Sequence, residues 1–334
     1  MRSRTISFAL LATLLIALLL FLGSRIIQFI QIFGTHGGTA LTQLQVEAAY
    51  NASLAAHHDD SGERREYIPR IIHQVFHNWK DPGNETLPSD WDAVRQTCIS
   101  NNPDFEYRLW TESESLKFLA DNYPWFLDTY QSYKYPVQRV DSLRYFIMRK
   151  MGGIYIDLDN GCSRDLKPLL YYPSWVTDGG HGALSNNIIA SRPGHPFWEM
   201  LTESLIPWNW NWVFPMFVIH YTSGQWFETA IWQKYHAQLP EQPAEEDTLN
   251  RILMDGREGA SPWVFFTQGR GGTWNQWDKG FFEWIGDRAI PWLGSHIILL
   301  ILVAAVVTGG LVWRRKKRRA GKKGYRSVAT SEMV

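Results

Sequence analysis

The chain has 334 residues, and its 33 basic and 33 acidic side chains give a formal net charge of zero at neutral pH. Basic residues are concentrated after residue 313, so the middle of the chain carries an acidic excess, which argues against a nucleic-acid-binding surface there. Between its two ends the chain has room for one domain with a single large core.

The first apolar segment runs from Ile6 to Leu22 and continues toward Phe33. It is long enough to cross a bilayer. A cleaved signal peptide is the alternative, but no clear small-residue cleavage site follows the segment. We therefore expect residues 1–33 to form a short cytosolic end and a membrane anchor. Residues 34–66 are polar and lack a sustained apolar period, which predicts a lumenal stem.

The folded domain is expected to begin at Tyr67 and to alternate strands with helices. Strands are predicted from β-branched and aromatic runs, and helix starts from capping boxes. The expected elements are a strand at 70–77, a helix opened by Ser89 with Asp92, a strand at 105–109 and a helix opened by Thr111 with Glu114. This order predicts an α/β domain with a mostly parallel sheet.

The next helix begins at Pro136, ends at Gly152-Gly153 and leads into a strand from Ile154 to Asp159. Alternation along that strand places Asp157 and Asp159 on one face, at the end of the strand where α/β sheets bind ligands. Two neighbouring carboxylates repel each other unless a cation lies between them, and oxygen ligands suit Mg²⁺ or Mn²⁺. A solvated strand end with two exposed acids is the alternative.

The helix before that strand carries a guanidinium on its apolar stripe. Arg144 falls among residues spaced for the core, and Asp141 lies at the edge of the stripe. A buried guanidinium needs an anionic partner. An i,i+3 salt bridge between the two residues is one interpretation; the other has Asp141 accepting sugar hydroxyls and Arg144 braced against an anionic donor.

Three sequence blocks together resemble glycosyltransferase family 32, the sugar transferases with a D-x-D motif. The blocks are Ile68-Pro69-Arg70-Ile71-Ile72-His73-Gln74, Arg139-x-Asp141-x-x-Arg144-Tyr145 and Gly152-Gly153-Ile154-Tyr155-Ile156-Asp157-x-Asp159. The resemblance covers roughly residues 67–278. It implies a GT-A glycosyltransferase fold, which is Rossmann-like, together with a nucleotide-sugar donor, a Mn²⁺-type cofactor and retention of the anomeric configuration.

The resemblance also implies roles for the acidic residues. Asp159 matches the metal-ligating acid of the family, and Asp157 matches the acid shared between the metal and the ribose. Asp141 and Arg144 match contacts to the donor sugar, with Tyr145 in the same block. These residues form the expected catalytic centre, and the sequence singles out no catalytic nucleophile.

Two further blocks match donor-binding residues of the family. His73, Gln74 and Phe76 match the first-strand block that meets the nucleotide base, although many relatives have Trp at the position of Phe76. Thr273 and Trp274 match residues that close over the diphosphate, where relatives more often show Gly-Ser-Trp. A core or interfacial aromatic is the alternative interpretation of Trp274.

A second apolar segment, Ile290 to Trp313, is followed directly by six basic residues. Positive charge stays on the cytosolic side of membranes, so this segment predicts a second span and a cytosolic tail at residues 314–334. A nuclear-localisation signal or a nucleic-acid-binding patch is the alternative for the basic run. Both termini are then cytosolic, and residues 67–285 form a lumenal catalytic domain.

Two features fit a lumenal domain. Asn51-Ala52-Ser53 and Asn84-Glu85-Thr86 are glycosylation sequons. Cys98 and Cys162 lie in the same region, where a disulfide would persist. Two separately buried thiols are the alternative.

Within the family, two spans around a lumenal domain resemble the fungal mannosyl inositol phosphorylceramide synthases. An aromatic-rich segment from Trp198 to Trp232 and a cluster at 281–292 suit a site held near the bilayer interface. The expected activity is transfer of mannose from GDP-mannose to inositol phosphorylceramide at the Golgi membrane. The expected partners are a sphingolipid acceptor and a membrane regulatory subunit.

Two other functions remain open at this stage. A family 32 mannosyltransferase acting on protein-linked glycans would keep the fold and change the acceptor, but such enzymes usually lack the second span. A non-catalytic subunit of a transferase would keep the fold alone. The four charged residues Asp141, Arg144, Asp157 and Asp159 argue against the subunit.

Overall fold

The computed structural model describes residues 2–56, 65–180, 182–211, 213–256, 259–269, 277, 278, 280 and 284. The chain divides into two units, residues 1–274 and 275–334. The expected second span from Ile290 to Trp313 and the basic tail lie outside the described residues.

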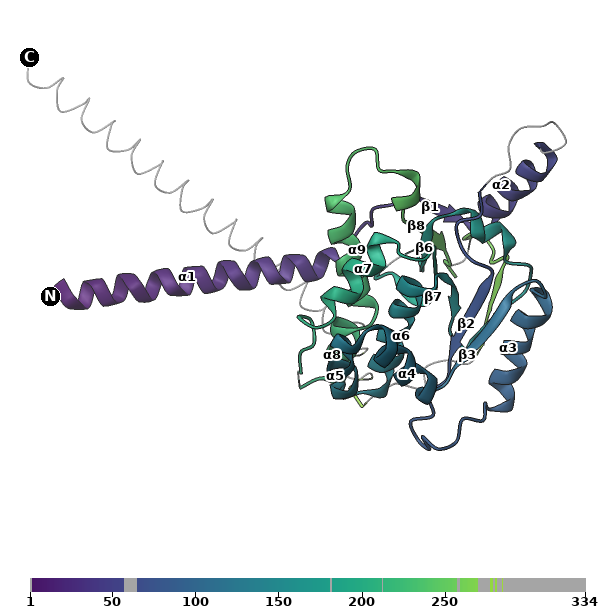
Figure 1. Ribbon diagram of the computed structural model, residues 1–334. Helices are drawn as coiled ribbons and strands as arrows, with labels where there is room; N and C mark the ends of the chain where they lie inside the picture. Colours follow the sequence, from purple (N-terminus) through teal and green to yellow (C-terminus); the bar gives the residue numbers. More distant parts are fainter. Residues whose placement is uncertain are drawn as a thin grey trace, which may run out of the picture. The chain divides into compact units, whose positions relative to one another are not determined.

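The centre of the first unit is a sheet with the strand order β1-β8-β6-β7-β4-β2-β3 (Figure 1). β7 runs antiparallel to its neighbours β6 and β4, and every other neighbouring pair is parallel. The strands are β1 (Ala40–Thr42), β2 (Ile71–Val75), β3 (Glu106–Trp110), β4 (Gly153–Ile156), β6 (Ser174–Asp178), β7 (Ser185–Ser191) and β8 (Asn250–Leu253). The predicted α/β domain with a mostly parallel sheet is therefore confirmed.

A second, two-stranded sheet pairs β5 (Asn160–Cys162) with β9 (Phe266–Gln268). α3 lies on one side of the main sheet, and α6 to α9 are grouped on the other (Figure 1). The α-helices of the described residues are α1 (Arg2–Gln31), α2 (Gln43–Ala56), α3 (Ser89–Asn101), α4 (Glu112–Asn122), α5 (Pro124–Ser132), α6 (Pro136–Lys150), α7 (Pro196–Ser204), α8 (Pro215–Thr222) and α9 (Gln225–Gln238).

The apolar core forms two clusters that meet opposite faces of the sheet. Tyr155 and Ile189 belong to one cluster, which includes residues of α5, α6, α7 and α9. Ile154, Ile156 and Ile188 belong to the other. Because side chains alternate across a strand, this division shows that β4 and β7 are buried on both faces, as their continuous apolar sequences require.

The helix starts confirm some of the sequence signals and correct one. Thr111 and Glu114 form the predicted capping box of α4. Pro136 occupies the first turn of α6, where the missing N–H costs nothing. The predicted box of Ser89 with Asp92 is wrong: Ser89 is already the first residue of α3, and the N-cap is Pro88, which makes no side-chain cap.

The segment before Tyr67 differs from the expected stem. Residues 40–42 form β1, which pairs in parallel with β8, and residues 43–56 form α2. Val46 is fully buried, and Gln43 accepts hydrogen bonds from the backbone N–H groups of Val264 and Phe265. The sequence did not predict this edge strand, because three residues are too few to show the alternation of apolar and polar side chains that marks a strand. The folded unit therefore begins ahead of Tyr67.

α1 is the one helix in the described part of the chain that is long and apolar enough to cross a membrane, over Thr13–Gln31. Its apolar side chains between those residues are largely exposed, as a surface facing lipid requires. This agrees with the expected anchor, by length and composition.

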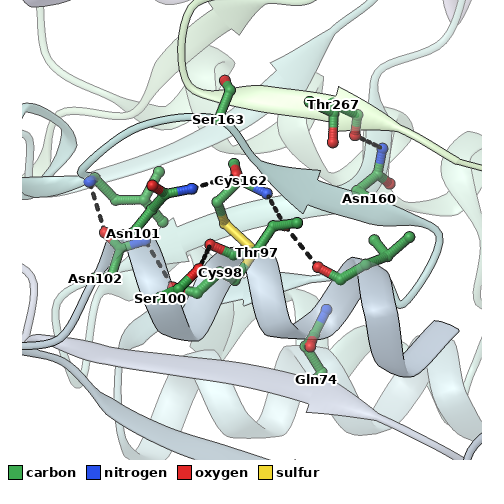
Figure 2. The surroundings of a disulfide bond; sticks show 12 residues. Gln74, Thr97, Cys98, Ser100, Asn101, Asn102, Asn160, Cys162, Ser163 and Thr267 are labelled. Atoms are coloured by element: carbon green, nitrogen blue, oxygen red, sulfur yellow. Dashed lines mark hydrogen bonds between the residues drawn. A yellow bond between two sulfur atoms is a disulfide. The ribbon is translucent and has the colours of Figure 1, made fainter.

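Cys98 and Cys162 form a disulfide, with Cα atoms 4.6 Å apart, and so join α3 to β5 (Figure 2). Hydrogen bonds reinforce this junction: Asn101 Nδ2 donates to Cys162 O (2.9 Å), and the Cys162 N–H donates to Thr97 Oγ1 (3.0 Å). Of the two alternatives left open by the sequence, the disulfide is correct. It fixes the strand that directly follows Asp159.

Candidate functional site

A cavity of about 300 Å³ lies beside the end of β4. Its walls come from α6, the turn after β4, the start of β7, the α8–α9 junction and β9. The polar side chains that line it among the described residues are Asp141, Arg144, Asp157, Asp159, Asn160, Ser185, Asn186, Asn187, His220, Gln225 and Gln268. The four charged residues singled out by the sequence therefore converge on one space.

Arg144 is the centre of the charge network. Its guanidinium lies 3.1 Å from Asp141 Oδ1 and 3.1 Å from Asp157 Oδ1, and it donates to Asn186 O at 2.7 Å. Burial alone lowers the pKa of Arg144, but the charges around it, Asp157 first, raise the pKa above its usual range. The i,i+3 salt bridge with Asp141 is therefore present, and the same guanidinium also reaches Asp157, while the contacts of Asp141 and Arg144 with a sugar donor stay predictions.

Asp157 and Asp159 lie in a turn, which corrects the predicted strand. β4 ends at Ile156, and the Asn160 N–H donates to Asp157 O (2.9 Å), which closes the turn. Asn160 and Gly161, which follow the turn directly, belong to β5. After the turn the chain is held against the residue that follows β9, because the Gly269 N–H donates to Asp159 O.

Asp157 is held in a fixed orientation. Its Oδ1 accepts a hydrogen bond from the Tyr155 hydroxyl (2.6 Å), and its backbone N–H donates to Asn187 O (2.8 Å). The Arg144 guanidinium lies over the Tyr155 ring, 4.7 Å from its centroid. With 27% of its side chain exposed, Asp157 is more accessible from the cavity than Arg144, whose side chain is 4% exposed.

Asp159 is the less neutralised of the two acids. Within the described part of the chain it takes part in no ion pair, whereas Asp157 pairs with Arg144. Burial, and next the negative charge of Asp157, raise the pKa of Asp159 to about 6. A cation bound at this point would relieve the repulsion between the carboxylates.

Asp141 is a buried residue in the wall of the cavity. Its two carboxylate oxygens accept hydrogen bonds from Asn186 Nδ2 (3.1 Å) and Ser223 Oγ (3.2 Å). The pKa of Asp141 is raised to about 6. Burial is the main cause; the positive charge of Arg144 opposes the rise, and the negative charge of Asp157 adds to it. The carboxylate is thus held rigidly at the wall of the cavity.

The donor set fits a hard divalent cation held jointly with a ligand. No group of three or more His, Cys, Asp and Glu side chains that could hold a metal occurs in the described ranges. Asp157 and Asp159 supply oxygen atoms only, which Mg²⁺ and Mn²⁺ prefer, and Mg²⁺ sites commonly use one or two carboxylates and complete the shell with water and phosphate oxygens. A diphosphate would supply the missing ligands.

The residues predicted to meet the nucleotide base are placed elsewhere. His73 is fully buried in β2; its Nε2 lies 3.0 Å from Gly152 O, and its Nδ1 accepts from Trp110 Nε1. Burial lowers the pKa of His73 to about 3, so the ring is neutral. Gln74 accepts a hydrogen bond from Tyr107, and Phe76 is buried against Trp91 in an edge-to-face contact.

None of these three residues is among the described residues that line the cavity. His73 therefore has a place inside the sheet, and base contacts by Gln74 and Phe76 stay predictions. Tyr145 also lies behind the wall: its hydroxyl donates to Ser223 O (2.8 Å) and accepts from Asn186 Nδ2 (2.9 Å). Thr273 and Trp274 lie outside the described residues.

Two asparagines are central to the site but were given no role by the sequence. Asn186 bridges Asp141 and Tyr145, and Asn187 donates to Asn160 Oδ1 (3.1 Å) and accepts from Ser185 Oγ (2.7 Å). The sequence signal that could have found them is a pair of adjacent amide side chains at the start of an apolar strand. Buried amides need partners, so such a pair indicates a polar network at the strand end.

A family model described as "Glycosyltransferase sugar-binding region containing DXD motif" matches residues 88–175. Inositol phosphoceramide mannosyltransferase 2 of Schizosaccharomyces pombe is 39% identical over 226 residues, which cover 68% of this chain and 63% of that protein. Inositol phosphoceramide mannosyltransferase 1 of the same organism is 31% identical, over 71% of this chain and 72% of that protein. Mannosyl phosphorylinositol ceramide synthase SUR1 of Saccharomyces cerevisiae is 36% identical, over 65% of this chain and 54% of that protein.

Proposed function

Because the chain belongs to the family of DXD-motif glycosyltransferases that includes these inositol phosphoceramide mannosyltransferases, we propose that it transfers mannose from GDP-mannose to inositol phosphorylceramide. The matched region covers 63% of the length of the first of those relatives. We therefore propose that the shared region is sufficient for the activity. The fold is then of the GT-A type, and transfer retains the anomeric configuration. The enzyme works in the Golgi membrane with its catalytic unit in the lumen.

The observation that carries the proposal is the convergence of four charged residues on one cavity. Asp157 and Asp159 would hold a divalent ion, which when bound would act as a Lewis acid on the leaving diphosphate. Arg144 keeps its positive charge at the same wall and offsets negative charge that develops on the departing group.

The remaining residues orient the reactants. Asn186 donates a hydrogen bond to Asp141, and the two residues present an amide and a carboxylate to the hydroxyls of the donor sugar. Tyr155 and Asn187 hold the side chain and the backbone of Asp157. Reacting groups held in this way need little further ordering to react, which is a large part of the rate that such a site can supply.

The test uses the purified full chain in vesicles that contain inositol phosphorylceramide, supplied with GDP-mannose and Mn²⁺. We expect a lipid product heavier by one hexose, detected by mass spectrometry, and no product from Asp159→Ala. Asp121→Ala, at an exposed acid paired with Lys117, is the matched control and should behave as wild type. Transfer to a protein-linked glycan without transfer to the lipid would refute the proposed acceptor. If the protein turned over no nucleotide sugar, the proposal that it is an enzyme would be refuted.

A further inference from the structure

The carboxyl-terminal end of α1 is docked on the folded unit. The Phe29 ring lies 5.2 Å from that of Trp226 and 6.2 Å from that of Phe217, measured between centroids. Gln233 Nε2 donates to Gln31 O at 2.6 Å, and Ile32 is buried. The apolar helix is therefore joined to α8 and α9 by specific contacts, which a flexible tether would lack.

An exposed apolar surface continues from this junction. In the loop between α7 and α8, Ile206, Trp210 and Val213 are 44%, 40% and 78% exposed. Ring contacts connect the loop to the anchor, because Tyr221 lies 6.3 Å from Trp210 and 6.3 Å from Phe29. We call Ile206, Trp210, Val213, Tyr221 and Phe29 the aromatic face.

The position of the aromatic face relative to α1 indicates what covers it. If Thr13–Gln31 crosses a bilayer, Phe29 lies in its last turn, about 5 Å or less from the end of the span. Side chains that contact Phe29 are then at the boundary between lipid and water, where Trp and Tyr are enriched. Arg25, one turn earlier on α1, can extend its charged group to the same boundary.

α8 connects this face to the cavity. Phe217 and Tyr221 contact Phe29, while Ile219 and His220 of the same helix line the cavity. A helix of eight residues is only about 12 Å long, so the cavity wall and the anchor contact lie within that distance along it. His220 also stacks on Trp226, with centroids 5.0 Å apart.

We propose that the aromatic face rests in the bilayer interface and that α8 thereby holds one wall of the cavity at the membrane surface, where the head group of a lipid acceptor enters past Ile219 and His220. The lipid acceptor itself rests on the proposed function; the membrane contact does not. The face is thus a substrate-presenting surface as well as an anchoring one.

The first test reads membrane contact without activity. The sequence has two cysteines, and both are in the disulfide, so one introduced cysteine can be labelled selectively with bimane. The full chain carrying Val213→Cys is labelled and reconstituted in vesicles with doxyl-labelled lipids. We expect the doxyl groups to quench the bimane fluorescence. Leu54→Cys is the matched control: it is 52% exposed, lies on α2 on the other side of the sheet from α1, and should not be quenched (Figure 1).

The second test compares acceptors. The double variant Ile206→Glu/Val213→Glu should lose about tenfold in kcat/KM for acceptor in vesicles, through KM, because charges are costly in the interface. In the absence of acceptor, the double variant should hydrolyse GDP-mannose at the wild-type rate. The control variant Leu54→Glu should match wild type in both lipid transfer and GDP-mannose hydrolysis.

The outcomes separate the two ideas. No quenching at Val213→Cys would overturn the membrane contact and leave the face for a protein partner. Equal losses in lipid transfer and donor hydrolysis would also overturn it, since the variant would then have damaged the catalytic unit. Quenching without any mannosyl transfer by wild type would refute the proposed function and leave the membrane contact standing.

Discussion

The hydroxyl of Tyr155 donates a 2.6 Å hydrogen bond to Oδ1 of Asp157, two positions further along the chain. Side chains two apart on an extended strand share a face, so the last part of β4 orients the first acid of the motif before the turn begins. Tyr155 is fully buried, whereas Asp157, which accepts its hydrogen bond, lines the cavity.

The substitution Tyr155→Phe keeps the aromatic ring beneath Arg144 and removes only the hydroxyl that donates a hydrogen bond to Asp157. We expect kcat/KM for the donor to fall about tenfold, the equivalent of a lost hydrogen bond to a charged group, with a higher Mn²⁺ requirement. Steady-state kinetics over a range of Mn²⁺ concentrations would measure both. Tyr235→Phe, which removes a hydroxyl that donates to Asp247 O and does not line the cavity, should leave both unchanged. Equal effects in the two variants would contradict the orienting role.

Asp159→Asn should abolish metal-dependent binding of the nucleotide. The amide keeps the shape and removes the charge, so we expect a loss of about a hundredfold or more in turnover and no measurable Mn²⁺ binding in the presence of GDP by titration calorimetry. Chelation should inactivate wild type, and added Mn²⁺ should restore it. Asp121→Asn is the control. Full activity of wild type in chelator would refute the metal site.

Arg144→Lys should damage both fold and site. A lysine cannot reach Asp141, Asp157 and the carbonyl of Asn186 together, which leaves a buried carboxylate unpaired. We expect a loss of about 3 kcal/mol in the free energy of unfolding, measured by urea denaturation, and a large loss of donor turnover. Arg149→Lys, at a partly exposed pair with Glu203, should cost less than about 1 kcal/mol. Similar costs at both positions would contradict the buried network.

The paired change Cys98→Ser/Cys162→Ser should lower the free energy of unfolding by about 2–4 kcal/mol, because the bond closes a loop with a sequence separation of 64. Donor turnover should fall as well, since β5 directly follows Asp159. Denaturation of wild type with and without reductant provides the comparison. A variant as stable as wild type, with reductant having no effect on either, would show that the bond does not form.

Glu228 gives the chain a specific pH dependence of stability. It is fully buried on α9, and neither carboxylate oxygen has a hydrogen-bond partner among the residues that the structure describes. Burial raises its pKa from 4.5 to about 8. The folded state therefore keeps a proton that the unfolded state has lost, and stability that is complete below pH 4.5 is lost as the pH rises toward about 8.

Glu228→Gln carries no such proton and should melt several degrees higher than wild type at pH 8 but not at pH 5. Thermal melts at the two values would measure the difference. Glu203→Gln, at a largely exposed acid, is the control and should not change the pH dependence. An equal shift at both pH values would contradict a titrating Glu228.

The sequence predicted the sheet and α6 well because long periodic segments and glycines in constrained conformations leave strong signals. Gly152 and Gly153 have φ of +65° and +91°, and a Cβ on Gly153 would lie 2.7 Å from Ile71 O, so the pair had to be glycine and had to stop the helix. Asp141, Arg144, Asp157 and Asp159 were found because charged residues on apolar patterns require partners.

The parts that the sequence did not predict depend on contacts between distant segments. β1 is three residues long and gains its stability from β8, more than two hundred positions away. The partners of Asn186 and Asn187 come from α6, β5 and β6, and no local pattern reveals them. His73 has the residue type of a ligand, but its burial and the indole of Trp110 make it part of the interior.

The pairing of β1 with β8 decides where the protein can be cut. Truncation just before Tyr67, at the apparent end of a stem, would strip an edge strand from the sheet and expose the backbone of β8 to other chains. A water-soluble form for biochemistry should therefore start between the end of α1 and Ala40, and Phe217 and Trp226 would then need polar replacements where Phe29 had covered them.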